Sequence, residues 1–207
     1  MPVLEIRHIS DNNILGIWKI QEEPEELLKI VRLNSDEKEY YSSFTNALRR
    51  KHWLSYRMLI QEMTKGKCGS LYYDENGKLF PGDRNFHLSV SHSGDYSTVI
   101  INRANSTGID IEKISPRILK IAPRFMSDYE MTSCPPENAE AYLCTCWAIK
   151  EAIYKYHGKK GIDFKTQIRI ENFTYNLVGQ TSVSILNSNP VDIQFETVND
   201  YVLAFTL

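Results

Sequence analysis

The stretch WAIKEAIYK, residues 147–155, constrains the fold more than any other segment of the chain. It belongs to a longer segment, residues 137–158, whose apolar residues predict a helix ending at Gly158, a residue type common at helix C-termini. A helix that is apolar on most sides must be packed in a protein core. Charged side chains in such a helix are expected to be paired or to bind a cation. This helix has three of them: Lys150, Glu151 and Lys155.

The helix face that carries Glu151 supports two interpretations. On a helix, Trp147, Glu151 and Lys155 lie one turn apart and share a face. Glu151 and Lys155 then form a favourable pair that contributes about 0.2–0.5 kcal/mol, and an exposed salt bridge accounts for both. The surrounding alanines, isoleucines and tyrosines leave little room for a wide polar face, and this favours a functional role.

A second acidic segment, GIDIE at residues 108–112, predicts a strand. On a strand, Asp110 and Glu112 point to the same side, with Cα atoms roughly 6.6–6.8 Å apart. An exposed strand face with ordinary acids explains this pattern. Carboxylates this close also repel each other unless a cation lies between them. If Glu151 joins them, three carboxylates without His or Cys favour Mg²⁺, which keeps several waters and binds substrate phosphates.

The segment SVSHSG, residues 89–94, predicts a turn at the end of a strand. Its hydroxyl groups and backbone N–H groups suit a phosphate, and His92 adds a donor that can become cationic. A hairpin turn with a surface histidine is the alternative. Further candidate anion contacts in the first half of the chain are Arg50, Lys51, His52, Arg57 and Lys78.

The remaining patterns predict an α+β protein made of two halves of similar size, residues 1–105 and 106–207. Pro24 and Ser35 are expected near helix starts, and Asn76-Gly77 is a strong hairpin signal. The expected elements are a strand at 14–20, helices after 24 and within 35–63, a hairpin at 71–80, strands within 87–103 and at 107–114, helices at 118–133 and 137–158, and antiparallel strands within 166–207.

Composition excludes several classes of protein. A net charge of −2 on 207 residues does not suit a nucleic-acid-binding protein. No run approaches the roughly 20 apolar residues that span a bilayer, and the N-terminal residues lack the pattern of a signal peptide. The four cysteines form no C-x-x-C pair, so we expect neither a zinc site nor a disulfide framework, and a cytoplasmic location.

Taken together, these segments resemble the 4′-phosphopantetheinyl transferase superfamily. The S-H-S turn, the G-I-D-I-E strand and the W-x-x-K-E-x-x-x-K helix follow one another in the order of that family, across roughly residues 75–160. Arg124-Phe125 with Glu130, five residues after Phe125, is also similar to an R-F segment of the family that is followed by a Glu. The chain departs from the family pattern at Ser89, where the family often has Asn.

The resemblance to the Sfp-type subfamily implies a pseudo-dimer of two α+β halves in one chain, a monomer with its active site in the cleft between the halves. It implies that 4′-phosphopantetheine moves from coenzyme A to a serine of an apo acyl or peptidyl carrier protein, which releases 3′,5′-ADP. The carrier protein is expected to be acidic. Candidate contacts for it are Arg117, Lys120 and Arg124, with Ile118, Ile121, Phe125 and Met126.

The resemblance also implies the role of each site residue. Asp110, Glu112 and Glu151 would hold Mg²⁺. Glu151, or a water that it orients, would accept the serine proton, and Lys155 would stabilise the leaving phosphate. Lys150, about 100° around the helix from Glu151, is expected in a supporting phosphate-binding or structural role. The expected coenzyme A contacts are Ser91, His92, Lys78, Lys51, Arg57 and Lys150, and Lys51, His52 and Arg57 compete for its 3′-phosphate.

Two other functions compete with this one. A non-catalytic relative would bind coenzyme A or a carrier protein without transfer, but it has no need for all three carboxylates and Lys155. Another Mg²⁺-dependent phosphoryl-transfer enzyme would be expected to carry a G-x-x-x-x-G-K-[ST] loop, which the sequence lacks.

Overall fold

The computed structural model describes residues 3–207, and contacts between their backbones divide the chain into two units. Unit 1 comprises the residues up to Asp74 together with Leu79–Asn105, and unit 2 comprises Glu75–Lys78 and Ser106–Leu207. The boundary differs from the predicted one in a single segment, since the hairpin loop Glu75–Lys78 groups with unit 2. Each unit combines a sheet with helices, which confirms the predicted α+β class.

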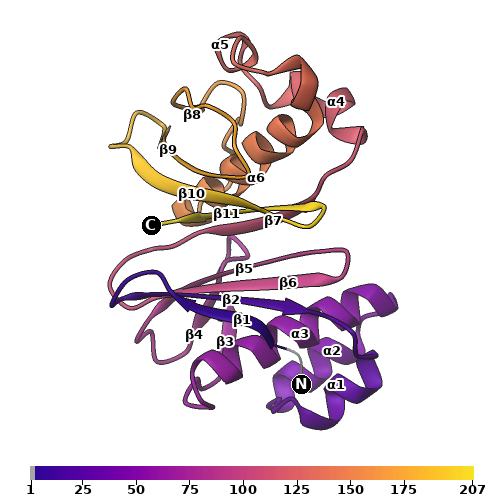
Figure 1. Cartoon of the computed structure of the whole chain (residues 1–207). Helices are drawn as coiled ribbons and strands as arrows, with labels where there is room; N and C mark the ends of the chain where they lie inside the picture. Colours follow the sequence, from indigo (N-terminus) through magenta and orange to yellow (C-terminus); the bar gives the residue numbers. More distant parts are fainter. Residues whose placement is uncertain (1–2) are drawn as a thin grey trace. The chain divides into compact units, whose positions relative to one another are not determined.

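Unit 1 consists of one antiparallel sheet with helices packed on one of its faces (Figure 1). The strand order in the sheet is β1-β2-β6-β5, and β3 and β4 form a separate hairpin. The strands are β1 (Val3–His8), β2 (Asn13–Lys19), β3 (Leu71–Tyr73), β4 (Leu79–Pro81), β5 (His87–Ser93) and β6 (Tyr96–Asn102). The helices are α1 (Pro24–Ile30), α2 (Ser35–Ser42) and α3 (Ala47–Met63).

The core of unit 1 lies between strand β2 and helix α3. Trp18 of β2 and Leu59 of α3 are fully buried. A Cβ atom on Gly16 would lie 2.6 Å from the Met63 sulfur, so side chains of α3 pack directly on the backbone of β2. Helix α2 begins at Ser35, and its N-cap is Asn34, which accepts a hydrogen bond from the backbone of Glu37.

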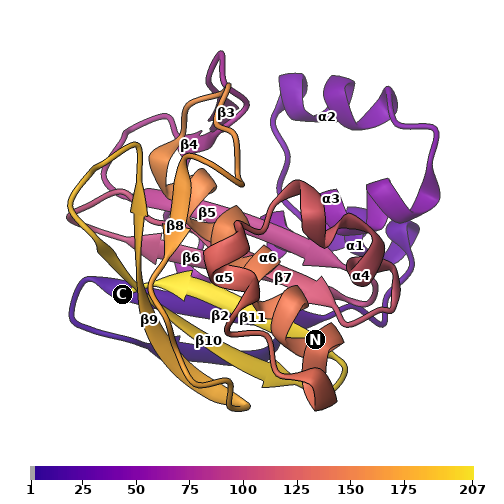
Figure 2. The same ribbon diagram turned by 90° about the horizontal axis from the view of Figure 1, so that it is seen from above.

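Unit 2 consists of a five-stranded antiparallel sheet with the long helix α6 packed on it. Figure 2 shows strands β11, β10 and β9 following one another in the order β7-β11-β10-β9-β8. The strands are β7 (Ile109–Lys113), β8 (Ile168–Ile170), β9 (Val178–Ile185), β10 (Val191–Val198) and β11 (Tyr201–Thr206). The helices are α4 (Arg117–Ile121), α5 (Asp128–Met131) and α6 (Ala139–His157), with 3₁₀ turns η1 (Ala122–Arg124) and η2 (Pro136–Asn138).

The predicted helix at 118–133 is wrong as a single element. Pro123 has no N–H group to continue the hydrogen bonds of α4, and the chain passes into η1 there. Ser127 then starts α5, since its side chain accepts a hydrogen bond from the backbone of Glu130. The prediction for the next helix is confirmed: α6 ends at Gly158, which has a φ of 72°.

Strand β7 and helix α6 approach each other as closely as their backbones allow. A Cβ atom on Gly108 would lie 1.9 Å from the Ala152 carbonyl oxygen and 2.8 Å from the Tyr156 backbone nitrogen. The hydroxyl of Thr206 accepts a hydrogen bond from the Gly108 backbone, which holds β7 against β11 at this point. Among residues 3–207, every helix is too short or too polar to cross a bilayer.

We expect Gly108→Ala to destabilise the protein strongly, because the added methyl group meets the backbone of α6. Forcing α6 away from β7 should lower the free energy of unfolding by about 1–3 kcal/mol or more, and the Tm by several degrees. The matched control is Gly69→Ala, since nothing lies within 4 Å of a Cβ atom at Gly69. Differential scanning calorimetry of both variants measures the effect, and an equal Tm for the two would contradict this packing.

Candidate active site

Strand β7 and helix α6 bring charged side chains of unit 2 together. The ammonium of Lys155 lies 2.7 Å from Oδ1 of Asp110 and also donates to the carbonyl of Ile109 at 3.1 Å. Asp110 is only 3% exposed. Trp147, two turns before Lys155 on α6, donates its indole N–H to Glu112 at 3.1 Å. Helix α6 therefore contacts both acidic residues of β7 through two side chains, Trp147 and Lys155, that lie two turns apart on one face of the helix.

Electrostatic interactions join Glu151 to the same group. Burial raises the pKa of Glu151 to about 7, and the charge of Asp110 adds to this effect while Lys155 opposes it. Burial likewise raises the pKa of Glu112 to about 7, with Asp110 acting in the same direction and the Trp147 hydrogen bond against it. We call Asp110, Glu112 and Glu151 the acidic cluster. The ammonium of Lys155 lies beside it through the ion pair with Asp110.

The acidic cluster fits a hard divalent cation by the chemistry of its donors. In the part of the chain that the structure describes, no three His, Cys, Asp or Glu side chains converge closely enough to form a finished metal cage. The three carboxylates nevertheless offer only oxygen ligands, which Mg²⁺ prefers. Burial, and after it the charge of Asp110, raises the pKa of both Glu112 and Glu151, and a bound cation would act against this effect.

A cavity of about 520 Å³ opens beside Glu151. Its walls are largely aromatic, and the ring of Trp147 lies 5.0 Å from that of Phe125 and 5.5 Å from that of Phe164. A group that reaches Glu151 through this cavity therefore passes apolar surface. The lining residues are Ile121, Arg124, Phe125, Trp147, Glu151, Tyr154, Ile162, Asp163 and Phe164.

Lys150 lies outside this group, although it is the neighbour of Glu151 in the sequence. Its ammonium is fully buried and lies 2.8 Å from Oε2 of Glu130. Burial lowers the pKa of Lys150, and the bond to Glu130 opposes this. The same ammonium donates to the backbone carbonyls of Phe125, Phe164 and Ile168 at 2.8–3.0 Å. These contacts use all its N–H groups, which favours the structural one of the two roles expected for Lys150 over a contact with coenzyme A.

The partner of Lys150, Glu130, fixes several segments of unit 2 at once. It accepts hydrogen bonds from the backbones of Ser127 and Ile170, at 2.8 Å and 3.0 Å. The pair thereby ties α6 to α5 and to strand β8. The sequence motif had included Glu130 without indicating this role. Glu130 and Lys150 are 20 residues apart, so no helical spacing pointed to their contact.

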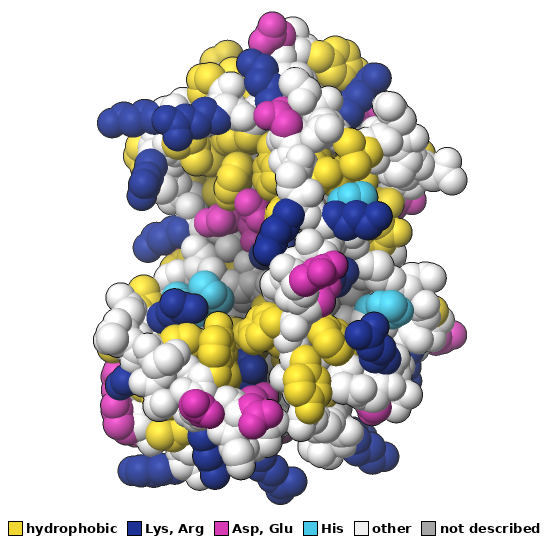
Figure 3. Space-filling view, turned by 180° about the vertical axis from the view of Figure 1, so that it is seen from behind, with side chains coloured by type: hydrophobic (Ala, Val, Ile, Leu, Met, Phe, Trp, Pro, Cys, Tyr) yellow, Lys and Arg dark blue, Asp and Glu magenta, His cyan; other side chains and the backbone are white. Residues whose placement is uncertain are grey.

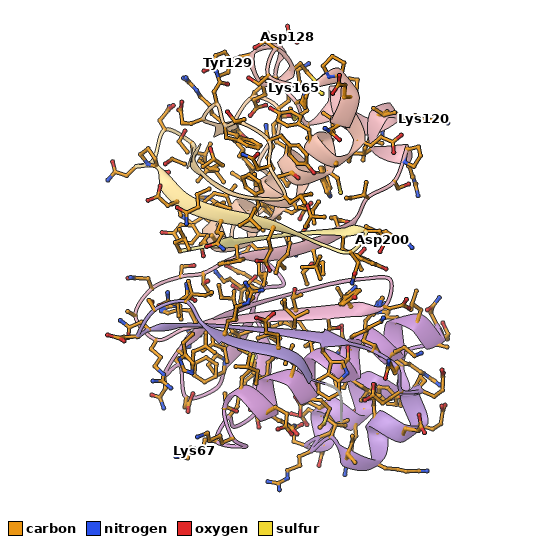
Figure 4. All side chains as sticks on the ribbon, in the orientation of Figure 1. Lys67, Lys120, Asp128, Tyr129, Lys165 and Asp200 are labelled. Atoms are coloured by element: carbon orange, nitrogen blue, oxygen red, sulfur yellow. The ribbon has the colours of Figure 1, made fainter. Side chains whose placement is uncertain are left out.

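We expect Lys150→Met to cost about 3–5 kcal/mol of unfolding free energy, because it leaves the buried Glu130 carboxylate without its cation. The double variant Lys150→Met/Glu130→Leu should recover part of this loss. The matched control is Lys165→Met, since Lys165 pairs with Asp128 at 3.8 Å on the surface, where Figure 4 labels both side chains. Chemical denaturation measures all three, and a loss for Lys150→Met as small as that of the control would contradict the assignment.

Unit 1 presents its candidate phosphate contacts at the turn between β5 and β6. His92 is exposed on β5, opposite Ser97 of β6, and its ring stacks on that of His52. Ser91, one residue earlier, is buried. Gly94 lies in this turn with a φ of 52°, a conformation that favours glycine.

The other predicted coenzyme A contacts have different surroundings. Lys51 is half-buried and pairs with Glu23 at 3.1 Å. Lys78 donates to the hydroxyl of Ser106 at 2.8 Å and to the carbonyl of Tyr156 at 3.3 Å, contacts that attach its loop to unit 2.

Arg57 makes its contacts inside unit 1. Its side chain is 2% exposed and its guanidinium lies 3.5 Å above the ring of Trp53. It donates to Glu37 at 3.2 Å and to the hydroxyl of Tyr56 at 2.9 Å. Through these contacts Arg57 stabilises the packing of α2 on α3, and its predicted contact with coenzyme A stays a prediction.

Only some of the residues predicted to contact a carrier protein are exposed. Arg117, Lys120 and Arg124 are exposed, and Figure 4 shows Lys120 pointing outward from α4. The apolar residues Ile118, Phe125 and Met126 belong to the core of unit 2 and do not face solvent. The exposed apolar side chain on α4 is Leu119, which the sequence analysis did not single out.

Residues 106–206 match a family model described as the 4′-phosphopantetheinyl transferase superfamily. This range includes the whole acidic cluster and all of helix α6. Residues 106–206 are thus similar in sequence to this superfamily. The resemblance carried by the sequence motifs is therefore confirmed.

Individual 4′-phosphopantetheinyl transferases align over about half of the chain. The chain is 39% identical over 114 residues to 4′-phosphopantetheinyl transferase psf-1 of Bacillus pumilus, covering 52% of this chain and 48% of psf-1. It is 31% identical over 108 residues to Sfp of Bacillus subtilis (strain 168), covering 50% and 46%. It is 31% identical over 116 residues to AcpT of Escherichia coli (strain K12), covering 53% and 59%. The chain thus spans about half the length of the curated relatives it matches.

We expect Mg²⁺ to stabilise the protein more at alkaline pH than at acidic pH. The pKa values of Glu112 and Glu151 are raised from 4.5 to about 7, so the folded state binds more protons than the unfolded state between these values. Stability contributed by the two protonated carboxyls is lost as the pH rises through about 7, where they ionise. Mg²⁺ should offset that loss. The Tm gain on adding Mg²⁺, measured at about pH 5.5 and 8, should rise with pH in the native protein and vanish in Glu151→Gln.

Proposed function

We propose that this protein transfers the 4′-phosphopantetheine group of coenzyme A to a serine of an apo acyl or peptidyl carrier protein, with release of 3′,5′-ADP. The observation that supports this most strongly is the acidic cluster with Lys155 beside it, on a strand and a helix that match the superfamily. A module that only binds a partner has no need to hold three carboxylates in partly buried positions, where their ionisation is disfavoured.

In this proposal, Asp110, Glu112 and Glu151 hold Mg²⁺. The ion, when bound, supplies positive charge that neutralises the pyrophosphate of coenzyme A. Glu151 lies on the wall of the cavity, and a carboxylate in such a position is a candidate proton acceptor. It would take the proton of the serine hydroxyl, directly or through a water. Lys155 would donate a hydrogen bond to the leaving phosphate, because its ammonium already lies at the acidic cluster.

The coenzyme A contacts form the part of the proposal that rests on unit 1. His92 and Ser91 at the β5–β6 turn would bind a phosphate, with Lys51 and Lys78 as further cations. That these residues and the acidic cluster act on one coenzyme A molecule, as the resemblance implies, stays a prediction.

The surroundings of Glu151 also suit the substrates. The aromatic cavity beside it accommodates a slender, mostly uncharged chain such as a pantetheine arm. Exposed Arg117, Lys120 and Arg124 would attract an acidic carrier protein locally. Figure 3 shows positive and negative side chains interspersed over the face it presents, in keeping with local attraction and a net charge of only −2.

The test is intact-protein mass spectrometry of apo carrier proteins incubated with this protein, coenzyme A and Mg²⁺. We expect a mass gain of one phosphopantetheine group. Its rate should fall at least about 100-fold in Glu151→Gln and in Lys155→Met, since each removes a group acting in the transition state, and should vanish with a chelator. Lys165→Met, at a surface ion pair, is the control and should keep the native rate.

The contrary result would be the absence of a mass gain on acyl and peptidyl carrier proteins alike. If coenzyme A still bound by calorimetry, the protein would be a non-catalytic relative that binds coenzyme A. A native rate in Glu151→Gln would instead leave the transfer in place and remove Glu151 from the reaction.

A further inference from the structure

Two histidine rings stack in unit 1, at the turn to which the proposed function assigns a phosphate. The ring centroids of His52 and His92 are 4.2 Å apart and the rings are inclined by only 16°. His92 is exposed on β5, whereas His52 on α3 is 6% exposed. One face of the exposed imidazole is thus covered by a buried one.

Hydrogen bonds fix the position of His52. Its Nε2 lies 2.8 Å from the carbonyl oxygen of Gly94. A carbonyl oxygen only accepts hydrogen bonds, so the proton of neutral His52 must be on Nε2. One turn further along α3, the hydroxyl of Ser55 lies 2.6 Å from that of Ser97 on β6. These two contacts fix the helix, and with it the His52 ring, against the β5–β6 hairpin.

The charge of the pair is divided unequally. Burial lowers the pKa of His52, and nearby Lys51 acts in the same direction, whereas the Gly94 hydrogen bond and Asp95 oppose it. Lys51 is itself paired with Glu23, and Asp95 is exposed. Two imidazolium rings stacked this closely would repel each other. The exposed ring of His92 is the one of the two that an anion in solvent could reach.

We infer that His52 is a positioning residue for His92: its neutral ring, locked by the Gly94 carbonyl, holds the His92 imidazole in one orientation and supports its cationic form beneath a bound phosphate. The face of a neutral aromatic ring attracts a cation, and a ring that is already oriented loses little entropy on binding. This inference rests on the proposed function, which assigns His92 to a phosphate of coenzyme A. Nothing in the motifs pointed to it, since His52 had entered only as a candidate phosphate contact.

The charge division is tested without any ligand. Imidazole ¹⁵N NMR spectra of the native protein are recorded between about pH 5.5 and 8, with His52→Gln and His92→Gln used for assignment. We expect His92 to titrate while His52 stays neutral with its proton on Nε2. Independent titration of both rings with ordinary pKa values near about 6.5 would overturn the inference.

Binding tests the positioning role. His52→Gln keeps an N–H donor for Gly94 but lacks the ring, and His52→Phe keeps the ring but lacks the donor. We expect His52→Gln to weaken coenzyme A binding by calorimetry, and to raise its KM, about tenfold with kcat unchanged, the effect of a lost cation–ring contact. His52→Phe should stay within about threefold of native affinity by the same argument. The control is His87→Gln, at an exposed position on the same strand, which should bind as the native protein does.

The outcomes separate this inference from the proposed function. Equal losses in His52→Gln and His52→Phe, or native affinity in His52→Gln, would overturn the role of the ring. A Tm measured for each variant shows whether the fold is kept. No coenzyme A binding by the native protein would contradict the proposed function itself, whereas binding that is indifferent to the His52 ring would contradict this inference alone.

Discussion

The direct packing of strand β7 against helix α6 is the constraint on which the site in unit 2 depends. Gly108 has no side chain, and any Cβ atom there would enter the backbone of α6 at Ala152. This close approach lets Lys155 reach the carboxylate of Asp110 and lets Trp147 reach Glu112. With a bulkier residue at position 108, the two elements would separate and the carboxylates would no longer influence one another as they do.

The buried ion pairs of this protein differ in role from the charged residues of the acidic cluster. The pair Lys150–Glu130 lies inside unit 2, and the pair Arg57–Glu37 lies inside unit 1. The hydrogen bonds of both pairs connect elements that are distant in the sequence. Both pairs are largely buried, and removing one partner of such a pair lowers the stability of the fold strongly because the other charge stays buried. The acidic cluster is different, because two of its three carboxylates have raised pKa values. Such raised pKa values are typical of groups that meet a ligand rather than of groups that only hold a fold.

Local periodicity predicted much of this arrangement. Alternation in GIDIE indicated strand β7, and the apolar pattern up to Gly158 indicated helix α6, because both signals are contained in a few consecutive residues. The grouping of Glu151 and Lys155 with the β7 acids followed from the same two patterns together with the family resemblance.

What the sequence did not predict depends on contacts between distant residues. Lys150 and Lys155 are both lysines on α6, and only the positions of the Phe164 and Ile168 carbonyls make the first one structural. The sequence does not indicate that Arg57 contacts Glu37, because the two residues are 20 apart and only the packing of α2 brings them together. The break at Pro123 and the attachment of Lys78 to unit 2 likewise follow from tertiary packing, which no spacing rule captures.

The central claim is that the acidic cluster holds a divalent cation that also contacts the phosphates of coenzyme A. The most direct measurement is pulsed electron paramagnetic resonance of Mn²⁺, substituted for Mg²⁺, in the native protein with coenzyme A. The account predicts bound Mn²⁺ with ³¹P couplings from coenzyme A, and the loss of the bound signal in Glu112→Gln. A spectrum of free aqueous Mn²⁺ in the native protein, or an unchanged spectrum in that variant, would contradict the account.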